Sequence, residues 1–470
     1  MRWNLCRRFG PWILIWSPFW ACSPSAPELP EAKQWLPESP PNVLLICIDT
    51  LRADAVDGGP NAAPTPHLDA LKASGLVADQ AWACSNQTVP GHVGVLTGLA
   101  ASRHGVRSNL EVFPDRVESL AERFQRAGWQ TAGVITNALL RPEAGWKRGF
   151  DQYLDHSDQV HDSKGLVAGG RPAAEVVNQA AHQLLQEFAT KDQPWFLFLH
   201  YLDPHVPYGA PAPFAGSQGG DPQALASRYR RHLLADPIAP ISQTLVRLVA
   251  ADLPRGRGEA RQAVRNLHNL YLEEVAYLDD KIGELLSWVQ QGDRPPVILF
   301  TADHGEQFGE HQRMLHATSL YEPAIRIPMI LHVPGGPQGF RLSAPVFQRD
   351  VAPTLLALAG LPWQDLDGRP MFQIDTGRDH LAGDAHWLSF YWGKWKAIAR
   401  RDASGPQLME LYDLEQDPQE EHNLLADQEA PQALVEALQR VLAQDQHRRP
   451  GPLGDRHKKI LQDLGYVEEE

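Results

Sequence analysis

Apolar runs that lead into polar residues form the most regular pattern along this chain. Four such runs occupy residues 42–49, 195–200, 297–303 and 328–333. Continuous apolar runs of this length are typical of strands that are buried on both faces of a parallel sheet. The first three runs end at, or lead into, an acid or a histidine. We therefore expect a buried sheet with polar side chains at the carboxyl ends of its strands.

Helical patterns separate these runs, for example at residues 66–74 and 117–127, and residues 260–291 predict one long amphipathic helix. The alternation predicts an α/β fold with a large, mainly parallel sheet sandwiched by helices, whose ligands bind outside the carboxyl ends of the strands. The segment 207–257 is rich in Pro and Gly and predicts an inserted loop or lid region.

The periodicity changes after residue 372. Residues 387–399 alternate like strands, and residues 430–443 have a helical pattern. We predict a catalytic domain at 42–372 and a small C-terminal subdomain at 373–470, with a short antiparallel sheet and terminal helices. A chain of 470 residues is long enough for such a second core.

The first 22 residues have the pattern of an export signal. Arg2, Arg7 and Arg8 precede a short apolar run at residues 9–20. The sequence around Cys22 resembles a bacterial lipoprotein cleavage site, with simple cleavage or an uncleaved anchor as alternatives. Residues 23–41 are rich in Pro, Ser and Ala and predict a flexible tether. We expect a cell-envelope lipoprotein held on the membrane through Cys22, or otherwise a periplasmic or secreted protein.

Net charge and cysteine content limit the partners and the redox chemistry. The chain carries 43 Lys and Arg against 57 Asp and Glu, a formal charge of −14. A nucleic-acid partner is excluded, because binding a polyanion needs a basic surface. Two of the four cysteines lie in the export segment, so the remaining Cys47 and Cys84 make no disulfide framework.

Two of the predicted strands end in side chains that suit a metal ion. Asp49 ends the first run, and Asp303 and His304 follow the third. Half-buried acids are costly unless a positive charge compensates them. Capping a helix or pairing with an arginine would satisfy one such acid, but two acids and a histidine together favour a divalent cation held by oxygen and imidazole.

A second segment, residues 87–98, predicts a helix that begins just after Thr88. Pro90 and the apolar residues that follow it support this start. A helix amino terminus can hold a tetrahedral oxyanion beside the Thr88 hydroxyl. The alternative is an ordinary threonine cap. His92, His200, His205 and His316 are candidates for contacting the transferred group and protonating the leaving oxygen.

Several ordered blocks resemble the sulfatases of the alkaline phosphatase superfamily. Thr88, Pro90 and His92 fall where that family has Cys or Ser, Pro and Arg, and Leu96-Thr97-Gly98 follows in register. Further matching blocks lie at 49–54, 65–69, 203–208, 302–306, 309–311, 320–323, 350–356 and 410–424. The resemblance covers about residues 42–425. It implies the alkaline-phosphatase-like fold, hydrolysis of ester bonds and an active site at the residues discussed above.

The departures from the family concern its usual nucleophile and its usual metal set. Sulfatases oxidise Cys or Ser to formylglycine, and threonine has no route to that group. Cys84 has Asn86 and Thr88 where its own motif would need Pro and Arg. Thr50 replaces the second aspartate of the usual calcium site. The residues that remain are Asp49, Thr88, Asp303 and His304. They resemble the one-metal sites of phosphotransferases such as lipoteichoic acid synthases, and in part those of nucleotide pyrophosphatases.

The sequence thus predicts one divalent ion, Mn, Zn or Ca, bound by Asp49, Thr88, Asp303 and His304, with Thr88 as nucleophile. The resemblance implies that His205 and His316 act at the leaving group. We expect His92, Asn137 and His200 to bind substrate, and Glu306, Glu310 and His311 to order a loop. Arg52 and Asp54 are predicted to form a local ion pair.

Three classes of function fit these residues. The first is hydrolysis or transfer of phosphodiester or phosphonate esters, because a threonine ester must be resolved by a second displacement. The second is sulfuric ester hydrolysis without formylglycine. The third is a non-catalytic binding protein on the sulfatase fold. A small-molecule, glycan or lipid ester is the expected ligand.

Overall fold

The computed structural model describes residues 35–160, 173–221, 243–255, 258–292, 294–374, 377–402 and 405–443. The predicted signal segment and Cys22 lie outside the described residues, as do residues 23–34 of the predicted tether. Trp35 is buried and meets the ring of Phe372 edge-on, with 5.1 Å between ring centroids. Within the described ranges, no helix combines the length and the apolar character needed to cross a bilayer.

The centre of the molecule is an eight-stranded sheet. Its strands lie in the order β11 (Phe340–Leu342), β2 (Leu76–Ala78), β10 (Met329–His332), β7 (Val297–Ala302), β1 (Val43–Ile48), β6 (Trp195–Tyr201), β4 (Gln130–Ile135) and β5 (Gln152–Asp155). Only β10 runs against its neighbours in this sheet. Every residue of β1, β6, β7 and β4 is buried, which is why these strands are continuous apolar runs in the sequence.

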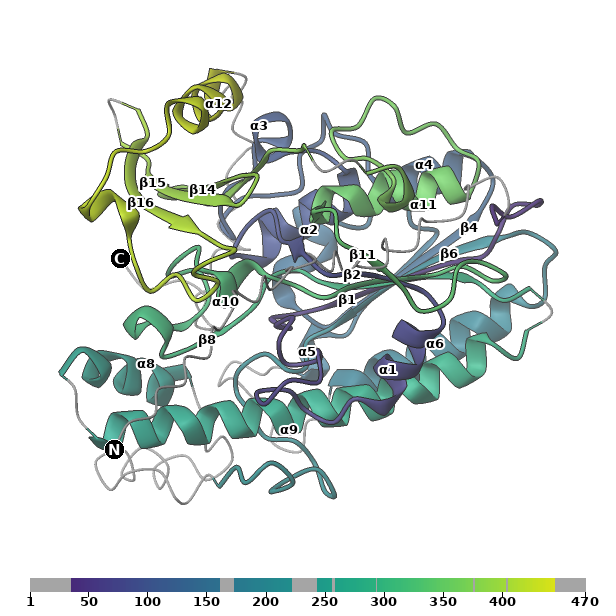
Figure 1. Cartoon of the computed structure of the whole chain (residues 1–470). Helices are drawn as coiled ribbons and strands as arrows, with labels where there is room; N and C mark the ends of the chain where they lie inside the picture. Colours follow the sequence, from purple (N-terminus) through teal and green to yellow (C-terminus); the bar gives the residue numbers. More distant parts are fainter. Residues whose placement is uncertain are drawn as a thin grey trace, which may run out of the picture.

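Helices cover both faces of this sheet (Figure 1). Three lie on one face, namely α1 (Pro66–Ala73), α6 (Ala173–Phe188) and α9 (Gly258–Val289). Three lie on the other, namely α2 (Thr88–Thr97), α4 (Leu120–Arg126) and α11 (Val351–Leu358). One large apolar cluster joins the sheet to both layers. The α/β sandwich predicted from the sequence is confirmed.

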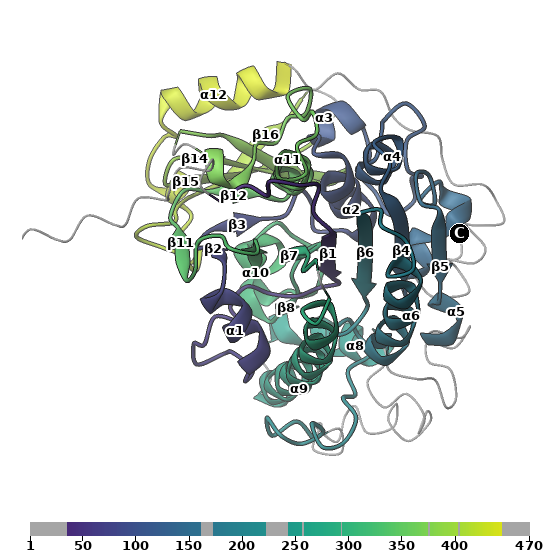
Figure 2. The same cartoon turned by 90° about the vertical axis from the view of Figure 1, so that its right-hand side faces the viewer.

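The predicted small antiparallel sheet is confirmed as well. It consists of β13 (His380–Gly383), β14 (Trp387–Trp392), β15 (Trp395–Arg400) and β16 (Gln407–Asp413), in sequence order. The helix α12 (Gln432–Ala443) packs on this sheet through Leu434, Ala437 and Leu438. Figure 2 shows the small sheet and α12 together at one side of the main sheet.

A local hydrogen-bond motif fixes the start of one predicted helix. The helix expected at 117–127 begins only at Leu120, because Ser119 and Glu122 form a reciprocal capping box. The Pro-rich insertion contains the helix α8 (Gln243–Asp252). Shorter elements are α3 (Ala101–His104), α5 (Ser157–Val160), α10 (Glu322–Ile325), β3 (Ala81–Trp82), β8 (Gln307–Phe308), β9 (Met314–Leu315) and β12 (Val346–Phe347).

Candidate active site

Two neighbouring strands bring the predicted metal residues together. β1 and β7 are parallel and in register, so that Ile48 pairs with Ala302. Asp49 therefore follows one strand beside Asp303, which follows the other, and His304 comes next. One ligand atom from each of these three side chains lies within 4.8 Å of the other two. All three side chains are fully buried.

The hydrogen bonds around these residues leave free ligand atoms. Asp303 Oδ1 accepts from the backbone N–H of Thr50 at 3.1 Å and of His304 at 2.7 Å. Asp49 Oδ1 and Asp303 Oδ2 have no hydrogen-bond partner among the described residues. His304 Nδ1 lies 2.9 Å from the Gly305 carbonyl, to which it donates, so Nε2 keeps its lone pair. Two orphaned carboxylate oxygens and one imidazole nitrogen fit a divalent cation.

Electrostatics support the same conclusion. Burial raises the pKa of Asp303 well above its usual value, and the nearby Asp49 raises it further. Burial opposes ionisation of Asp49 too, but His205, His200 and His304 hold the pKa of Asp49 below its usual range. Burial, together with His316, lowers the pKa of His304 to about 3. The ionised Asp49 thus opposes ionisation of Asp303, and a bound cation would allow both carboxyl groups to ionise.

Thr88 lies at the start of α2, beside this group. It is the first helical residue, and Gln87 takes the cap position. The Thr88 hydroxyl lies 3.4 Å from His304 Nε2, and Thr88 is 1% exposed. The helix approaches β7 closely, since a Cβ added to Gly91 would lie 2.8 Å from the Asp303 carbonyl oxygen. Glycine at this position lets the amino end of α2 reach Asp49 and Asp303, which we call the metal acids.

The three residues predicted to bind substrate all lie against the metal acids. Asn137 Nδ2 donates to Asp49 Oδ2 at 2.7 Å. His200 Nε2 lies 3.4 Å from the same oxygen. His92 Nδ1 lies 2.8 Å from the Thr88 carbonyl oxygen and 3.6 Å from Asp303 Oδ2. All three are fully buried, so their contacts support the metal acids directly.

His205 and His316 form the other wall of the site. Their ring centroids are 5.1 Å apart, and the His316 ring lies 4.6 Å from that of His304. His316 Nδ1 lies 3.1 Å from Glu306 Oε1. Burial lowers the pKa of both histidines and raises the pKa of Glu306 to about 7. The His316 side chain keeps 13% exposure, which leaves this wall as the more open one.

The predicted ion pair between Arg52 and Asp54 is present. Arg52 binds Asp54 and Glu310, each at 2.7 Å, and donates to the Glu306 carbonyl at 3.1 Å. His311 stacks on Tyr321, with ring centroids 3.6 Å apart.

Two supporting residues were not predicted. Gln348 Nε2 donates to the carbonyls of Ala302 and Asp303, and the Tyr208 hydroxyl donates to Glu306 Oε2. Gln348 has no local pattern that would reveal it, whereas Tyr208 lies in one of the family blocks.

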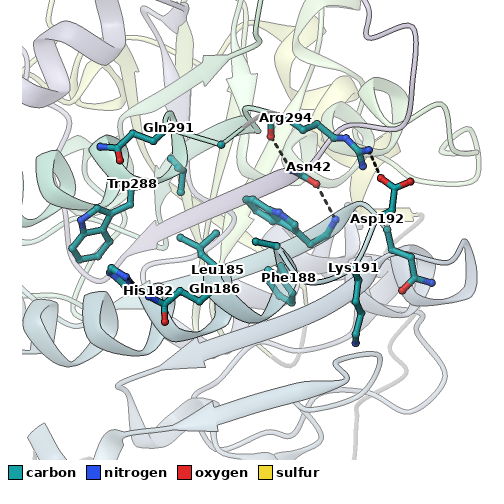
Figure 3. Close-up of a pocket in the computed structure, with 15 residues that line it drawn as sticks. Asn42, His182, Leu185, Gln186, Phe188, Lys191, Asp192, Trp288, Gln291 and Arg294 are labelled. Atoms are coloured by element: carbon teal, nitrogen blue, oxygen red, sulfur yellow. Dashed lines mark hydrogen bonds and ion pairs between the residues drawn. The ribbon is translucent and has the colours of Figure 1, made fainter.

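A cavity of about 590 Å³ lies at the opposite edge of the sheet (Figure 3). Asn42, which precedes β1, lines it together with His182 and Trp288 from the carboxyl-terminal halves of α6 and α9. Asp49 follows the other end of β1. At the usual rise per strand residue, it lies about 20 Å from Asn42. This cavity is therefore separate from the site of the metal acids.

Comparison with known proteins identifies the family. The sulfatase family model matches residues 41–361, and a model described as N-sulphoglucosamine sulphohydrolase, C-terminal, matches residues 309–448. This chain belongs to the sulfatase family. Among its relatives, this sulfatase is 25% identical to choline-sulfatase of Rhizobium meliloti (strain 1021) over 441 residues, which cover 83% of each chain. It is 25% identical to human iduronate 2-sulfatase over 341 residues, which cover 63% of this chain and 60% of the relative.

Solved structures share the fold. A protein in complex with its substrate D-glucosamine-2-N,6-O-disulfate superposes with a TM-score of 0.65 at 18% identity, covering 92% of this sulfatase and 99% of that chain. Phosphonate monoester hydrolase of Agrobacterium radiobacter gives the same TM-score at 20% identity, covering 86% and 95%. Family and fold together make this chain a hydrolase of ester bonds. Enzymes of the family are metal-dependent, and Asp49, Asp303 and His304 form a group that could hold a metal ion.

Proposed function

We propose that this sulfatase-family enzyme hydrolyses or transfers phosphodiester or phosphonate esters, with Thr88 as its nucleophile. The observation that carries this proposal is the position of the Thr88 hydroxyl. It lies 3.4 Å from His304 Nε2, at the amino end of α2 and beside unpartnered oxygens of Asp49 and Asp303. By its motif, Thr88 falls where the sulfatases that it resembles carry formylglycine, and a threonine side chain does not form that aldehyde.

Asp49, Asp303, His304 and Thr88 would hold the metal. A divalent cation bound there would lower the pKa of the Thr88 hydroxyl and stabilise charge on the transferred group. Mn, Zn and Ca are the candidate ions, and a turnover assay with each of them identifies the one that supports catalysis. The unmodified Thr88 oxygen attacks phosphorus in line, and the bond to the leaving oxygen breaks with its electron pair. Water, or an acceptor alcohol, then displaces Thr88 from phosphorus and restores the free side chain.

The surrounding residues position the substrate for these two displacements. The amino end of α2 offers backbone N–H groups and a positive dipole end to the anion. His205 and His316 stand on the more open wall and would contact the leaving oxygen there. Buried His92, His200 and Asn137 keep the metal acids in place from behind. Small-molecule, glycan or lipid esters would suit this site.

A sulfuric ester is the second candidate substrate, because the curated relatives named above are sulfatases. A sulfated Thr88 would require the same second displacement by water, whereas formylglycine releases sulfate by collapse of a hemiacetal. This difference favours phosphorus over sulfur.

Paired substrates separate the two candidates. Purified protein is incubated with Mn, Zn or Ca and with either bis-(4-nitrophenyl) phosphate or 4-nitrophenyl sulfate, and nitrophenol release is measured. We expect metal-dependent turnover that favours the phosphodiester by at least about tenfold in kcat/KM. Turnover of the sulfate alone would contradict the phosphoester proposal and leave the second candidate.

We further propose that the enzyme is a cell-envelope lipoprotein anchored through Cys22. The basic and apolar pattern before Cys22 supports this proposal. Cys22→Ser removes the acylated thiol, and a lipid chain contributes about 0.8 kcal/mol per buried CH₂ to membrane binding. We expect the native chain in the membrane fraction of a bacterial host and the variant outside it. An identical distribution of the two would exclude the anchor.

A further inference from the structure

The side chain of Gln348 joins the two segments that carry the candidate catalytic residues. Its Oε1 accepts from the backbone N–H of Cys84 at 2.9 Å. Its Nε2 donates to the carbonyl oxygens of Ala302 at 2.9 Å and Asp303 at 2.8 Å. Gln348 is fully buried, so solvent does not compete for these three hydrogen bonds. A single amide therefore connects the segment that leads to Thr88 with the end of β7.

The chemistry of this junction explains why its residue is a glutamine. The backbone presents one N–H donor and two carbonyl acceptors to the same buried side chain. Only a side-chain amide offers an acceptor oxygen together with two donor hydrogens. A glutamate would face the two carbonyls with acceptors only, and a methionine would leave all three backbone groups unpaired.

Helix α2 packs on both of the segments that Gln348 joins. At Gly91, an added Cβ would lie 2.8 Å from the Asp303 carbonyl oxygen, which is the oxygen that accepts from Gln348. At Gly94, an added Cβ would lie 2.9 Å from Cys84 Sγ and 3.6 Å from Gln348 Oε1. The helix therefore rests directly on the junction, and its distance from Asp303 depends on Gln348.

The surrounding elements hold this junction in place. β12 runs parallel to β3, so Gln348, which follows β12, lies beside the residues that follow β3. The preceding ring of Phe347 stacks on His380 of the small sheet, with ring centroids 4.2 Å apart. The carbonyl oxygen of Cys84 accepts from the N–H of Gly383 at 3.0 Å. The small sheet thus holds the segment before α2 through one backbone group, and Gln348 holds it through the other.

We propose that Gln348 is a positioning residue, which sets the spacing between the amino end of α2 and Asp303 so that the Thr88 hydroxyl and the metal acids can reach one cation. This inference rests on the proposed function, in which Thr88 is a metal ligand. Without the amide, three buried backbone groups lose their partners, and α2 and β7 can move apart. Displacing a reacting group by about 1 Å costs about 100-fold in rate, and losing a residue that supports a metal ligand costs about 10–100-fold in metal affinity.

Metal binding and turnover of Gln348→Met test this assignment. Methionine is similar in length and volume but makes none of the three hydrogen bonds. After removal of bound metal, native and variant proteins are titrated calorimetrically with Mn²⁺, Zn²⁺ or Ca²⁺ in the absence of substrate. For the ion that the native protein binds most tightly, we expect Kd to rise by about tenfold. At saturating metal, kcat for bis-(4-nitrophenyl) phosphate should fall by about 100-fold, with KM changed by less than about threefold.

A double-variant cycle separates positioning from general damage. In a Thr88→Ala background the hydroxyl is already gone, so Gln348→Met should raise the Kd for the metal by less than about threefold more. An equal rise in both backgrounds would mean that Gln348 does not act through the spacing to Thr88, and the proposal would be overturned. An unchanged Kd and kcat in the single variant would overturn it as well.

Failure of the proposed function has a different signature. If Thr88→Ala binds the ion as tightly as the native protein, Thr88 is no metal ligand, and this inference falls with the proposed role of Thr88. If Thr88→Ala weakens metal binding and Gln348→Met does not, only this inference falls. The titrations need no ester, so their result is the same for a phosphoric and a sulfuric ester hydrolase.

Gln130→Met is the matched control for the loss of a buried glutamine. Gln130 begins β4, at the edge of the main sheet opposite to the metal acids, and its Nε2 donates to the Gln193 carbonyl at 3.4 Å. This variant should keep the native Kd and kcat even if its melting temperature falls, and an equal rise in Kd would overturn the proposal.

A second variant tests the same spacing if Gln348→Met does not fold. Gly94→Ala leaves the Gln348 amide intact, but its Cβ pushes α2 away from Cys84. We expect the same rise of about tenfold in the Kd for the metal. A folded Gly94→Ala protein with the native Kd would overturn the proposal.

Discussion

At the scale of single residues, Thr88 had two explanations in the sequence, a nucleophile or a helix cap. The structure argues against the second explanation, because Gln87 takes the cap position of α2 and Thr88 is the first helical residue. Thr88 is buried, so its hydroxyl is not displayed to solvent, and His304 Nε2 lies 3.4 Å from it. The hydroxyl thus faces a candidate metal ligand, which is the position that the proposed nucleophile requires.

Substitution of Thr88 tests this explanation. Thr88→Ala removes the attacking oxygen and leaves the helix start intact, so we expect a folded protein whose kcat/KM falls by at least roughly a thousandfold. Thr88→Ser keeps the hydroxyl and should retain measurable turnover. Melting temperatures of both variants control for folding. Near-native turnover of Thr88→Ala would mean that water attacks directly and that Thr88 has no covalent role.

At the scale of elements, the long buried strands were predictable and the short ones were not. β1, β6 and β7 are continuous apolar runs, because both of their faces are covered by helices. β2, β3, β11 and β12 hold only two or three residues each, too few for any period to appear. Their pairing is decided by neighbouring strands that lie far away in the sequence, as when β11 pairs with β2.

The same distinction explains which site residues were predictable. Residues at the carboxyl ends of buried strands, such as Asp49 and Asp303, can be found because adjacent parallel strands end at one edge. Gln348 lies beside Asp303 only through tertiary packing, so the sequence around it carries no sign of its role. The partner of His316, Glu306, lay in a recognised block, but only the geometry pairs the two.

The approach of α2 to β7 makes a prediction about Gly91. Alanine is the better helix former by about 1 kcal/mol and would stabilise an ordinary helix interior. Here its Cβ would lie 2.8 Å from the Asp303 carbonyl oxygen. We expect Gly91→Ala to cost about 1–3 kcal/mol and to lower kcat/KM by about 100-fold, because α2 must move away from the metal acids. Thermal melting and steady-state kinetics measure both effects.

A matched control is Gly59→Ala. Gly59 is exposed, and an added Cβ there would meet nothing within 4 Å. This variant should keep native stability and turnover. A Gly91→Ala protein that is more stable than the native one and fully active would show that the close approach is not needed.

At the scale of the whole molecule, a buried charge cluster joins the small sheet to the main body. Lys396 of β15 is fully buried, with its amino group 2.9 Å from Glu322 Oε1 and 2.6 Å from Glu420 Oε1. Tyr391 and Trp82 also donate to the Glu322 carboxylate. Glu322 begins α10, whose next residue packs against Gly305, beside the candidate metal ligand His304. The small sheet thus supports the segment that carries the candidate metal ligands Asp303 and His304.

Glu420 makes the stability of this junction depend on pH. Burial raises its pKa to about 7, from 4.5, with Lys396 opposing the shift and Glu322 adding to it. Between pH 4.5 and 7 the folded chain therefore holds a proton that the unfolded chain has released. Stability must fall as pH rises through this window, since the unfolded state binds fewer protons. A pKa displaced this far corresponds to a loss on the order of 3 kcal/mol.

Glu420→Gln removes this titration while it keeps the shape of the side chain. Other buried acids, such as Glu274, also have a raised pKa and lower the stability of both proteins over the same range, so the difference between variant and native isolates Glu420. We expect the melting temperature of the variant, relative to the native protein, to rise by a few degrees between pH 5 and pH 8. The amide keeps only one acceptor oxygen for the Glu322 N–H and the Lys396 amino group, and this loss lowers the variant's stability at every pH without changing the trend. Glu421→Gln, at an exposed neighbouring position, should run parallel to the native protein. If the melting temperature of Glu420→Gln changes with pH in the same way as that of the native protein, Lys396 keeps Glu420 ionised. The junction would then be an ion cluster that does not depend on pH.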